Sequence, residues 1–212
     1  MRIKWHGHAS FELEDSRDVV HVDPREFRGE TKKADLILIT HAHESHFDLK
    51  AINHVSKDDT LLVGPPKSLD KEIEHKFIQV VSPGDFLEHR GVSVHVVPAF
   101  HPEGDYHSEG DGVGYILEMD GKRIYHAGDT GIHHNMHFFD DIDIALIPIG
   151  GLYNLTMHEA VEATRLINPE IVIPMHYGYM DYYPADPYRF KELAEEATHS
   201  KVEILENNIL YI

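Results

Sequence analysis

The sequence predicts an α/β protein in which two β-sheets pack face to face and helices cover them on the outside. Three observations support this fold class. Apolar runs of strand length recur along the chain, helical patterns separate the later runs, and tight turns such as Asp120-Gly121 join neighbouring runs. The length of 212 residues suits a single domain spanning residues 1–212.

The predicted strands are short apolar runs bounded by turn residues. One of them, Leu36–Ile39, is continuously apolar, which is typical of a strand buried on both faces. The strands cover approximately Arg2–Trp5, Ser10–Leu13, Asp18–Val22, Leu36–Ile39, Thr60–Val63, Val92–Val97, Val113–Glu118, Arg123–His126, Ile144–Pro148, Ile171–Pro174 and Val202–Leu205.

Two helices carry clear start signals. Met157–Ile167 follows Thr156, a good N-cap, and Glu159 completes the capping box three residues later. The second helix, Pro187–Thr198, has proline at its first position. Asp186 is its expected N-cap. Shorter helices are predicted over approximately Phe47–Val55 and Ser68–Lys76.

Composition narrows the class of protein. The chain is 42% hydrophobic and 26% charged, as in ordinary globular proteins, and it has no apolar run long enough to span a membrane. No signal-peptide pattern follows Met1, so we expect a cytoplasmic location. The net charge of −18 disfavours binding to nucleic acid, although a local basic pocket for one phosphate stays open.

Metal-ligand residues are unusually frequent. The absence of cysteine excludes thiolate metal sites and cysteine nucleophiles, so any metal must be bound by nitrogen and oxygen. Histidine, the commonest metal ligand, occurs 19 times. At that frequency, chance gives on the order of 0.15 occurrences of H-x-H-x-x-H, so one such motif is only moderately specific.

That motif occurs where the buried strand Leu36–Ile39 ends. His41 and His43 project to the same side of an extended segment, and His46 follows after three more residues. The run therefore brings three imidazoles to one place. The alternative interpretation is a histidine-rich surface loop.

Three later strands also run into residues of the metal-ligand type. The apolar runs Val96–Phe100, Arg123–Ala127 and Ile171–Met175 lead into His101, Asp129 and His176. Loops at strand ends are where a rigid scaffold presents catalytic groups. Gly128, beside Asp129, removes a side chain and allows close approach.

This ordered set of motifs resembles the metallo-β-lactamase fold superfamily, over nearly the whole chain. Within it, the sequence is most similar to the small metal-dependent hydrolases that include the ascorbate-6-phosphate lactonases. The resemblance implies a four-layer αββα sandwich of two packed mixed β-sheets with helices outside. It rests on His6-Gly7-His8-Ala9-Ser10-Phe11, Val22-Asp23-Pro24, Thr40 to His46, Ala99-Phe100-His101, His126-Ala127-Gly128-Asp129-Thr130-Gly131, Pro148-Ile149-Gly150-Gly151 and Ile173-Pro174-Met175-His176-Tyr177-Gly178.

The resemblance also implies two metal positions. The first takes His41, His43 and His101 together with Asp129, and the second takes His46 and His176 with Asp129 as the bridge. Asp129 is also expected to help accept a proton during catalysis. Asp23 lies behind the metals and orients a ligand histidine, as outer carboxylates do.

One position departs from the family pattern. The superfamily motif is H-x-H-x-D-H, whose aspartate binds the second metal, and Ser45 stands there in this chain. A neutral hydroxyl is a far poorer ligand than a carboxylate. Whether the site binds one metal or two therefore stays open. The candidate oxygen ligand nearest to position 45 in the sequence is Asp48. Of the histidines outside the motif, His8 and His107 are candidates for substrate contacts.

The metal set indicates hydrolysis. Nitrogen and oxygen ligands suit Zn²⁺ first, with Mn²⁺, Fe²⁺, Co²⁺ or Ni²⁺ as alternatives. Such a metal activates water near neutral pH. We therefore expect a metal-dependent hydrolase, lactonase-like or esterase-like, that cleaves an ester, lactone or phosphoester bond of a small metabolite, with or without a phosphate group. Whether the protein forms a homo-oligomer stays open. The alternatives are a phosphodiesterase or nuclease of the same superfamily, and a non-catalytic metal-binding protein.

Overall fold

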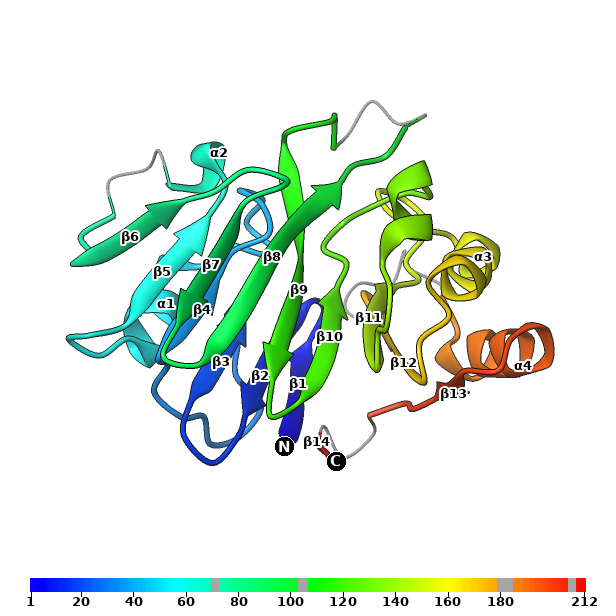
Figure 1. Ribbon diagram of the computed structural model, residues 1–212, viewed down its shortest axis with the longest axis horizontal. Coiled ribbons are helices and arrows are strands. Elements are labelled where there is room, and N and C mark those ends of the chain that lie inside the picture. The colour runs from blue at the N-terminus through cyan, green and yellow to red at the C-terminus, as the bar shows by residue number, and fades with distance from the viewer. Residues whose placement is uncertain (70–72, 103–106, 179–184, 206–208) are drawn as a thin grey trace.

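A computed structural model describes residues 1–69, 73–102, 107–178, 185–205 and 209–212. Within these ranges the chain forms two seven-stranded sheets (Figure 1). The first sheet has the order β14 (Ile209–Tyr211), β1 (Arg2–Gly7), β2 (Ser10–Glu14), β3 (Val19–Val22), β4 (Leu36–Leu38), β5 (Leu61–Gly64) and β6 (Phe77–Val80). The second has the order β13 (Lys201–Val202), β12 (Ile171–Met175), β11 (Ile144–Pro148), β10 (Lys122–His126), β9 (Gly112–Met119), β8 (Val92–Ala99) and β7 (Phe86–His89).

Both sheets are mixed, as the sequence predicts. In the first sheet, pairing is antiparallel from β14 to β3 and parallel from β3 to β6. In the second, pairing is antiparallel from β7 to β10 and parallel from β10 to β13. Parallel neighbours end at the same edge of a sheet, so the loops that follow β3 and β4, or β10, β11 and β12, emerge together.

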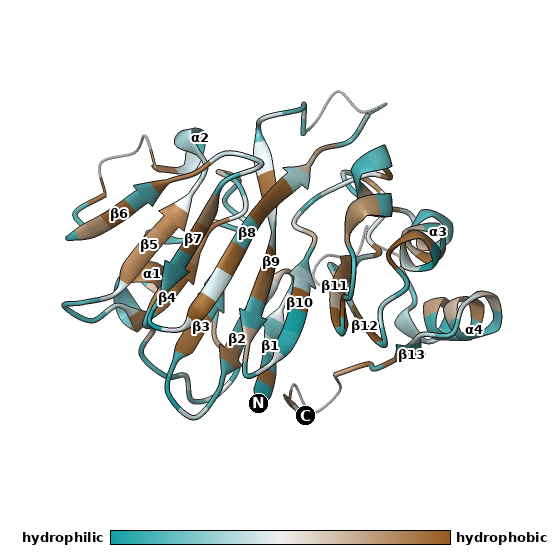
Figure 2. Cartoon of the chain, in the orientation of Figure 1, coloured by the Kyte–Doolittle hydropathy of each residue, from teal (hydrophilic) through white to brown (hydrophobic). Residues whose placement is uncertain are grey.

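Strand β4 shows how side chains divide between two cores. Leu36 and Leu38 join the large core that contains residues of both sheets. Ile37 and Ile39 point the other way and pack in a smaller cluster with Ile52 of helix α1 (Leu49–Val55). This alternation follows from the two-residue period of a strand. The strands are brown over much of their length in Figure 2, whereas the loops are mostly teal.

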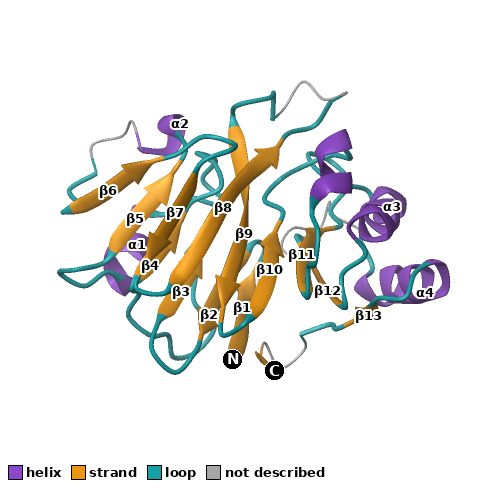
Figure 3. Cartoon of the chain, in the orientation of Figure 1, coloured by secondary structure: helices purple, strands orange, loops and turns teal. Residues whose placement is uncertain are grey.

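The helices lie on the outside of the strands. Figure 3 shows α1 and the short α2 (Pro66–Leu69) near β4–β6, and α3 (Met157–Ile167) and α4 (Pro187–Ala197) beyond β11 and β12. A 3₁₀ helix, η1, covers His134–Phe138. Both predicted caps are confirmed, because Thr156 and Glu159 form a capping box and Asp186 accepts bonds from the first turn of α4. No helix in the described residues is long and apolar enough to cross a membrane.

The main errors of the sequence prediction fall at the sheet edges. Strands β6, β7 and β14 were not expected, since edge strands are short and partly exposed and carry weak patterns. The helix predicted over Ser68–Lys76 is wrong in extent. Its described part ends with α2 at Leu69, residues 70–72 lie outside the described residues, and residues 73–76 are not helical.

A buried carboxylate fastens the loop between β3 and β4 to the first sheet. Glu12 of β2 accepts hydrogen bonds from Thr31 and Lys32 of that loop, pairs with Arg2, and lies 3.4 Å from Nε2 of His6. Burial raises the pKa of Glu12, but the hydrogen bonds from His6 and Thr31 outweigh it and lower the pKa from 4.5 to about 2. The fold therefore favours the ionised carboxylate.

This network predicts an acid-dependent loss of stability. A depressed carboxyl pKa adds stability above the unfolded value, and that stability disappears as the pH falls from about 4.5 to about 2. We expect Glu12→Gln to be less stable than the parent at neutral pH and to lose less stability over this range, as measured by urea unfolding. Glu118→Gln, at a partly exposed ion pair with Arg123, is the control. Parallel curves for the parent and Glu12→Gln would contradict the prediction.

Candidate metal centre

The predicted ligand residues stand on loops at one edge of the two sheets. His41, His43 and His46 follow β4, Asp129 follows β10 and His176 follows β12. In the second sheet, β10 and β12 both run parallel to β11, so they end on the same side. The fold thus brings together groups that are up to 135 positions apart in the sequence, from 41 to 176.

Asp129 lies at the centre of this group. Its side chain is buried, with Oδ2 placed 3.4 Å from Nε2 of His46 and 3.9 Å from Nε2 of His41. Its other oxygen, Oδ1, lies 3.2 Å from Nε2 of His176 and accepts a 3.3 Å hydrogen bond from Asn154. Burial raises the pKa of the Asp129 carboxyl, but His176 and His46 outweigh it and hold that pKa well below its usual range.

The His46 ring is fixed from behind by Asp23. Oδ2 of Asp23 lies 2.7 Å from Nδ1 of His46, and both Asp23 oxygens accept hydrogen bonds from Thr40, at 2.7 Å from its backbone N–H and 2.6 Å from its hydroxyl. Burial lowers the pKa of His46, but Asp129 and Asp23 together raise it to about 10. Asp23 therefore has the geometry of an outer carboxylate that orients a ligand histidine.

A first group of imidazoles consists of His41, His43 and His107, whose ring nitrogens lie within 4.8 Å of one another. Nε2 of His107 also lies 3.6 Å from Oδ2 of Asp129. The structure thus places His107 where the resemblance implies His101. The backbone N–H of His101 bonds to the carbonyl of His107, and its ring lies against Gly131. A ligand role for His101 stays a prediction.

A second group consists of His8, His46 and His176, again with ring nitrogens within 4.8 Å of one another. His8 comes from the turn between β1 and β2. Burial lowers the pKa of its imidazole to about 2, and the neighbouring His176 and His46 act in the same direction. The ring is therefore neutral, the form in which histidine binds metals.

Asp48, the oxygen ligand nearest to Ser45 in the sequence, has a structural role. Its Oδ1 accepts hydrogen bonds from the backbone N–H groups of Lys50 and Ala51, and it is the N-cap of α1. Loss of this cap would leave the first turn of the helix unsatisfied. The structure therefore does not bring Asp48 into the metal group.

The residues at this site fit a divalent metal. Nε2 of His41 and Nε2 of His107 are buried, face Asp129 and have no hydrogen-bond partner in the described part of the chain. Buried polar atoms are normally satisfied, so such atoms indicate a missing ligand. Two glycines leave room for the backbone and side chains that form the site. A Cβ on Gly128 would come within 2.9 Å of the Val113 carbonyl, and one on Gly150 within 2.8 Å of the His176 ring.

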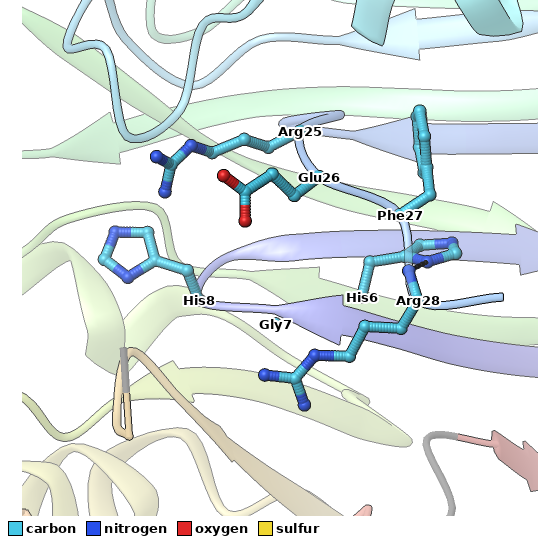
Figure 4. A pocket seen from close by; sticks show the side chains of 7 residues that line it. All are labelled: His6, Gly7, His8, Arg25, Glu26, Phe27 and Arg28. Carbon is cyan, nitrogen blue, oxygen red and sulfur yellow. Dashed lines mark hydrogen bonds between the residues drawn. The ribbon is translucent and has the colours of Figure 1, made fainter. Parts of the chain in front are cut away.

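A small pocket of about 140 Å³ adjoins the second imidazole group. Figure 4 shows the His8 and Arg25 side chains extending to the same side, with Arg28 beyond Gly7. The Arg28 guanidinium lies over the Trp5 ring at 5.2 Å. The pocket thus combines an imidazole of the second group with two arginines, and the exposed Glu26 also lines it.

Two mixed sheets with histidines and an aspartate at their strand ends define a metal-dependent hydrolase of the metallo-β-lactamase fold. The chain belongs to the β-lactamase superfamily domain family, which matches residues 2–176. A UPF0173 metal-dependent hydrolase of Thermoplasma volcanium is 37% identical over 206 residues, covering 92% of this chain and 91% of the relative.

Solved structures agree with this assignment. A metal-dependent hydrolase from Parabacteroides distasonis has a TM-score of 0.84 and 33% identity, and the match covers 95% of this chain and 91% of that one. Igni18, a metallo hydrolase from Ignicoccus hospitalis, has a TM-score of 0.82 and 28% identity over 100% of this chain and 98% of its own.

The first imidazole group gives a direct test of its third ligand. We expect His107→Ala to weaken binding of Zn²⁺ to chelator-treated protein, because it removes a nitrogen from the group around Asp129. His101→Ala should leave binding closer to the parent value. Competition titration with a chromophoric chelator measures both affinities. The opposite ranking would return the ligand role to His101.

Proposed function

We propose that this protein hydrolyses the ester or lactone bond of a small acidic metabolite, with phosphorylated substrates included, and that Zn²⁺ is its metal. The observation that carries the proposal is the position of Arg25 and Arg28 beside the metal centre, in a chain whose net charge is −18. A single domain, a cytoplasmic location and a homo-oligomer stay predictions.

The residues of the site have different roles in the proposed reaction. A divalent metal bound there supplies a water nucleophile near neutral pH and polarises the bond to be broken. Asp129 is a buried carboxylate whose oxygens lie between 3.2 and 3.9 Å from the ring nitrogens of four histidines, and it is placed to accept a proton. Asp23 holds the His46 ring in one orientation, and Asn154 holds one oxygen of Asp129. These bonds fix the geometry before substrate arrives, which favours catalysis.

The two arginines supply the recognition of an anion. Arg25 is close enough to His8 to act on its pKa electrostatically, so it lies near the reacting centre. The Arg28 head group is held over Trp5 and beside Gly7. Guanidinium groups bind carboxylate and phosphate through paired hydrogen bonds. A substrate with an acidic group in this pocket would present its neighbouring ester bond to the metal centre.

A screen of hydrolysable substrates tests the proposed reaction. The Zn²⁺-loaded protein should hydrolyse sugar-acid lactones or esters that carry a carboxylate or phosphate more rapidly than neutral analogues of the same size. Rates are measured by acid release at constant pH. Activity confined to phosphodiesters would favour the phosphodiesterase alternative. Stoichiometric metal without turnover of any ester would favour the metal-binding alternative.

Substitution of Arg25 tests the recognition of charge. We expect Arg25→Ala to lower kcat/KM by about 10- to 150-fold for an anionic substrate, the effect of losing a charged hydrogen bond. A neutral analogue should change little. Arg165→Ala, at an exposed i,i+3 ion pair on α3, is the matched control. Equal losses for anionic and neutral substrates would show that Arg25 does not select charge.

A further inference from the structure

His8 lies against two of the predicted ligands of the second metal. Its ring centroid is 3.7 Å from that of His176 and 5.0 Å from that of His46. All three side chains are buried, with exposed fractions of 3% or less. His46 and His176 also lie beside opposite oxygens of Asp129. The group therefore contains three imidazoles and a carboxylate, which is a donor set suited to a divalent transition metal.

The backbone fixes His8 in this position. Its carbonyl accepts a 3.0 Å hydrogen bond from the Trp5 indole and a 3.1 Å bond from the backbone N–H of His176. The Trp5 ring also packs on Tyr177 at 4.9 Å. The β1–β2 turn is thus tied to the loop after β12, and this tie places the His8 and His176 rings in contact.

Both histidines have an unusual backbone conformation. His8 has φ of 52° and His176 has φ of 65°, in the left-handed region that only a few per cent of residues other than glycine adopt. Such strain is characteristic of functional sites and persists only where the surrounding structure enforces it. A tight turn alone would be served better by glycine or asparagine at position 8. The backbone conformation alone therefore does not explain a histidine at position 8, whereas a role for its imidazole does.

We propose that His8 is a metal ligand, which completes a second divalent site with His46, His176 and Oδ1 of Asp129. In this arrangement a neutral imidazole from the β1–β2 turn performs the role of a carboxylate at position 45. Ser45 has no charge, and Asp48 is engaged at the start of α1. The inference concerns metal occupancy and does not depend on which substrate is hydrolysed.

The ligand chemistry predicts a metal preference. Three imidazoles favour Zn²⁺, Co²⁺ or Ni²⁺, whereas Mg²⁺ and Ca²⁺ require mainly oxygen ligands. A site completed by aspartate would tolerate oxygen-preferring metals better. The exchange of a carboxylate for His8 therefore narrows the range of metals that the second site accepts.

A cycle of two substitutions tests the proposal. The variants are His8→Asn, Ser45→Asp and the double variant, since asparagine keeps the left-handed backbone at position 8 without an imidazole. His133→Ala is the control, because His133 is buried beside Phe100 and is in neither imidazole group. Each protein is stripped with chelator and titrated with Zn²⁺. Elemental analysis and the absorption spectrum of the Co²⁺ form report the occupancy.

We expect two Zn²⁺ per chain in the parent protein and in His133→Ala. His8→Asn should weaken the second Zn²⁺ by more than about 100-fold, since loss of even an outer partner of a ligand costs roughly 10- to 100-fold. Adding Ser45→Asp to His8→Asn should restore the second Zn²⁺. Circular dichroism confirms that each variant is folded.

Three results would overturn the proposal. The first is a parent protein that binds only one Zn²⁺, and the second is a folded His8→Asn variant that binds two with unchanged affinity. The third is failure of Ser45→Asp to restore the metal lost in His8→Asn. Because metal counts need no substrate, a negative substrate screen would leave these outcomes unaffected.

Discussion

The buried carboxylate of Asp129 is the constraint on which the site depends. An ionised carboxylate removed from water is costly unless positive charge or hydrogen bonds surround it. Here one oxygen lies beside His176 and Asn154, and the other beside His46 and His41. Without a metal, a proton on His46 balances the charge, consistent with its raised pKa. A divalent metal bound through Nε2 of His46 would displace that proton, so metal binding would be coupled to proton release.

Several residues that surround Asp129 have unusual backbone conformations. Eight residues other than glycine have positive φ in the described residues, and four of these belong to the site: His8, Asp23, His107 and His176. Two others have ordinary local reasons, since Asp120 forms the β9–β10 turn and Asn168 caps α3. Among the site residues, His8 lies in the β1–β2 turn, and Asp23 and His176 each follow directly after a strand. They are held by two well-packed sheets, whose rigid strand ends determine where each loop must turn.

Local pattern predicted much of the fold, and contacts between loops account for most of what it missed. The buried strands and both helix caps depend on residues close together in the sequence, so periodicity and capping rules identify them. The histidine run could likewise be predicted because one loop carries it. For His8 and His107 the sequence predicts only substrate contacts. Their places beside the ligands depend on how separate loops meet, as in the bond from the His176 backbone to the His8 carbonyl, and no local pattern encodes that meeting.

The charges at the site are organised separately from the charge of the whole chain. Charges more than about 8 Å apart are largely screened at physiological ionic strength, so the net −18 is weakly felt at the metal centre. At about 4 Å, two unit charges still interact by about 4 kcal/mol at an effective dielectric constant of 20. In the proposed second site an imidazole would stand in place of a carboxylate, which removes one negative charge, and Arg25 lines the pocket next to that imidazole. Both features make the site more attractive to an anion. If both proposals hold, the serine at position 45 and the arginine beside His8 act in the same direction, and the metal ligands themselves would contribute to selecting an acidic substrate.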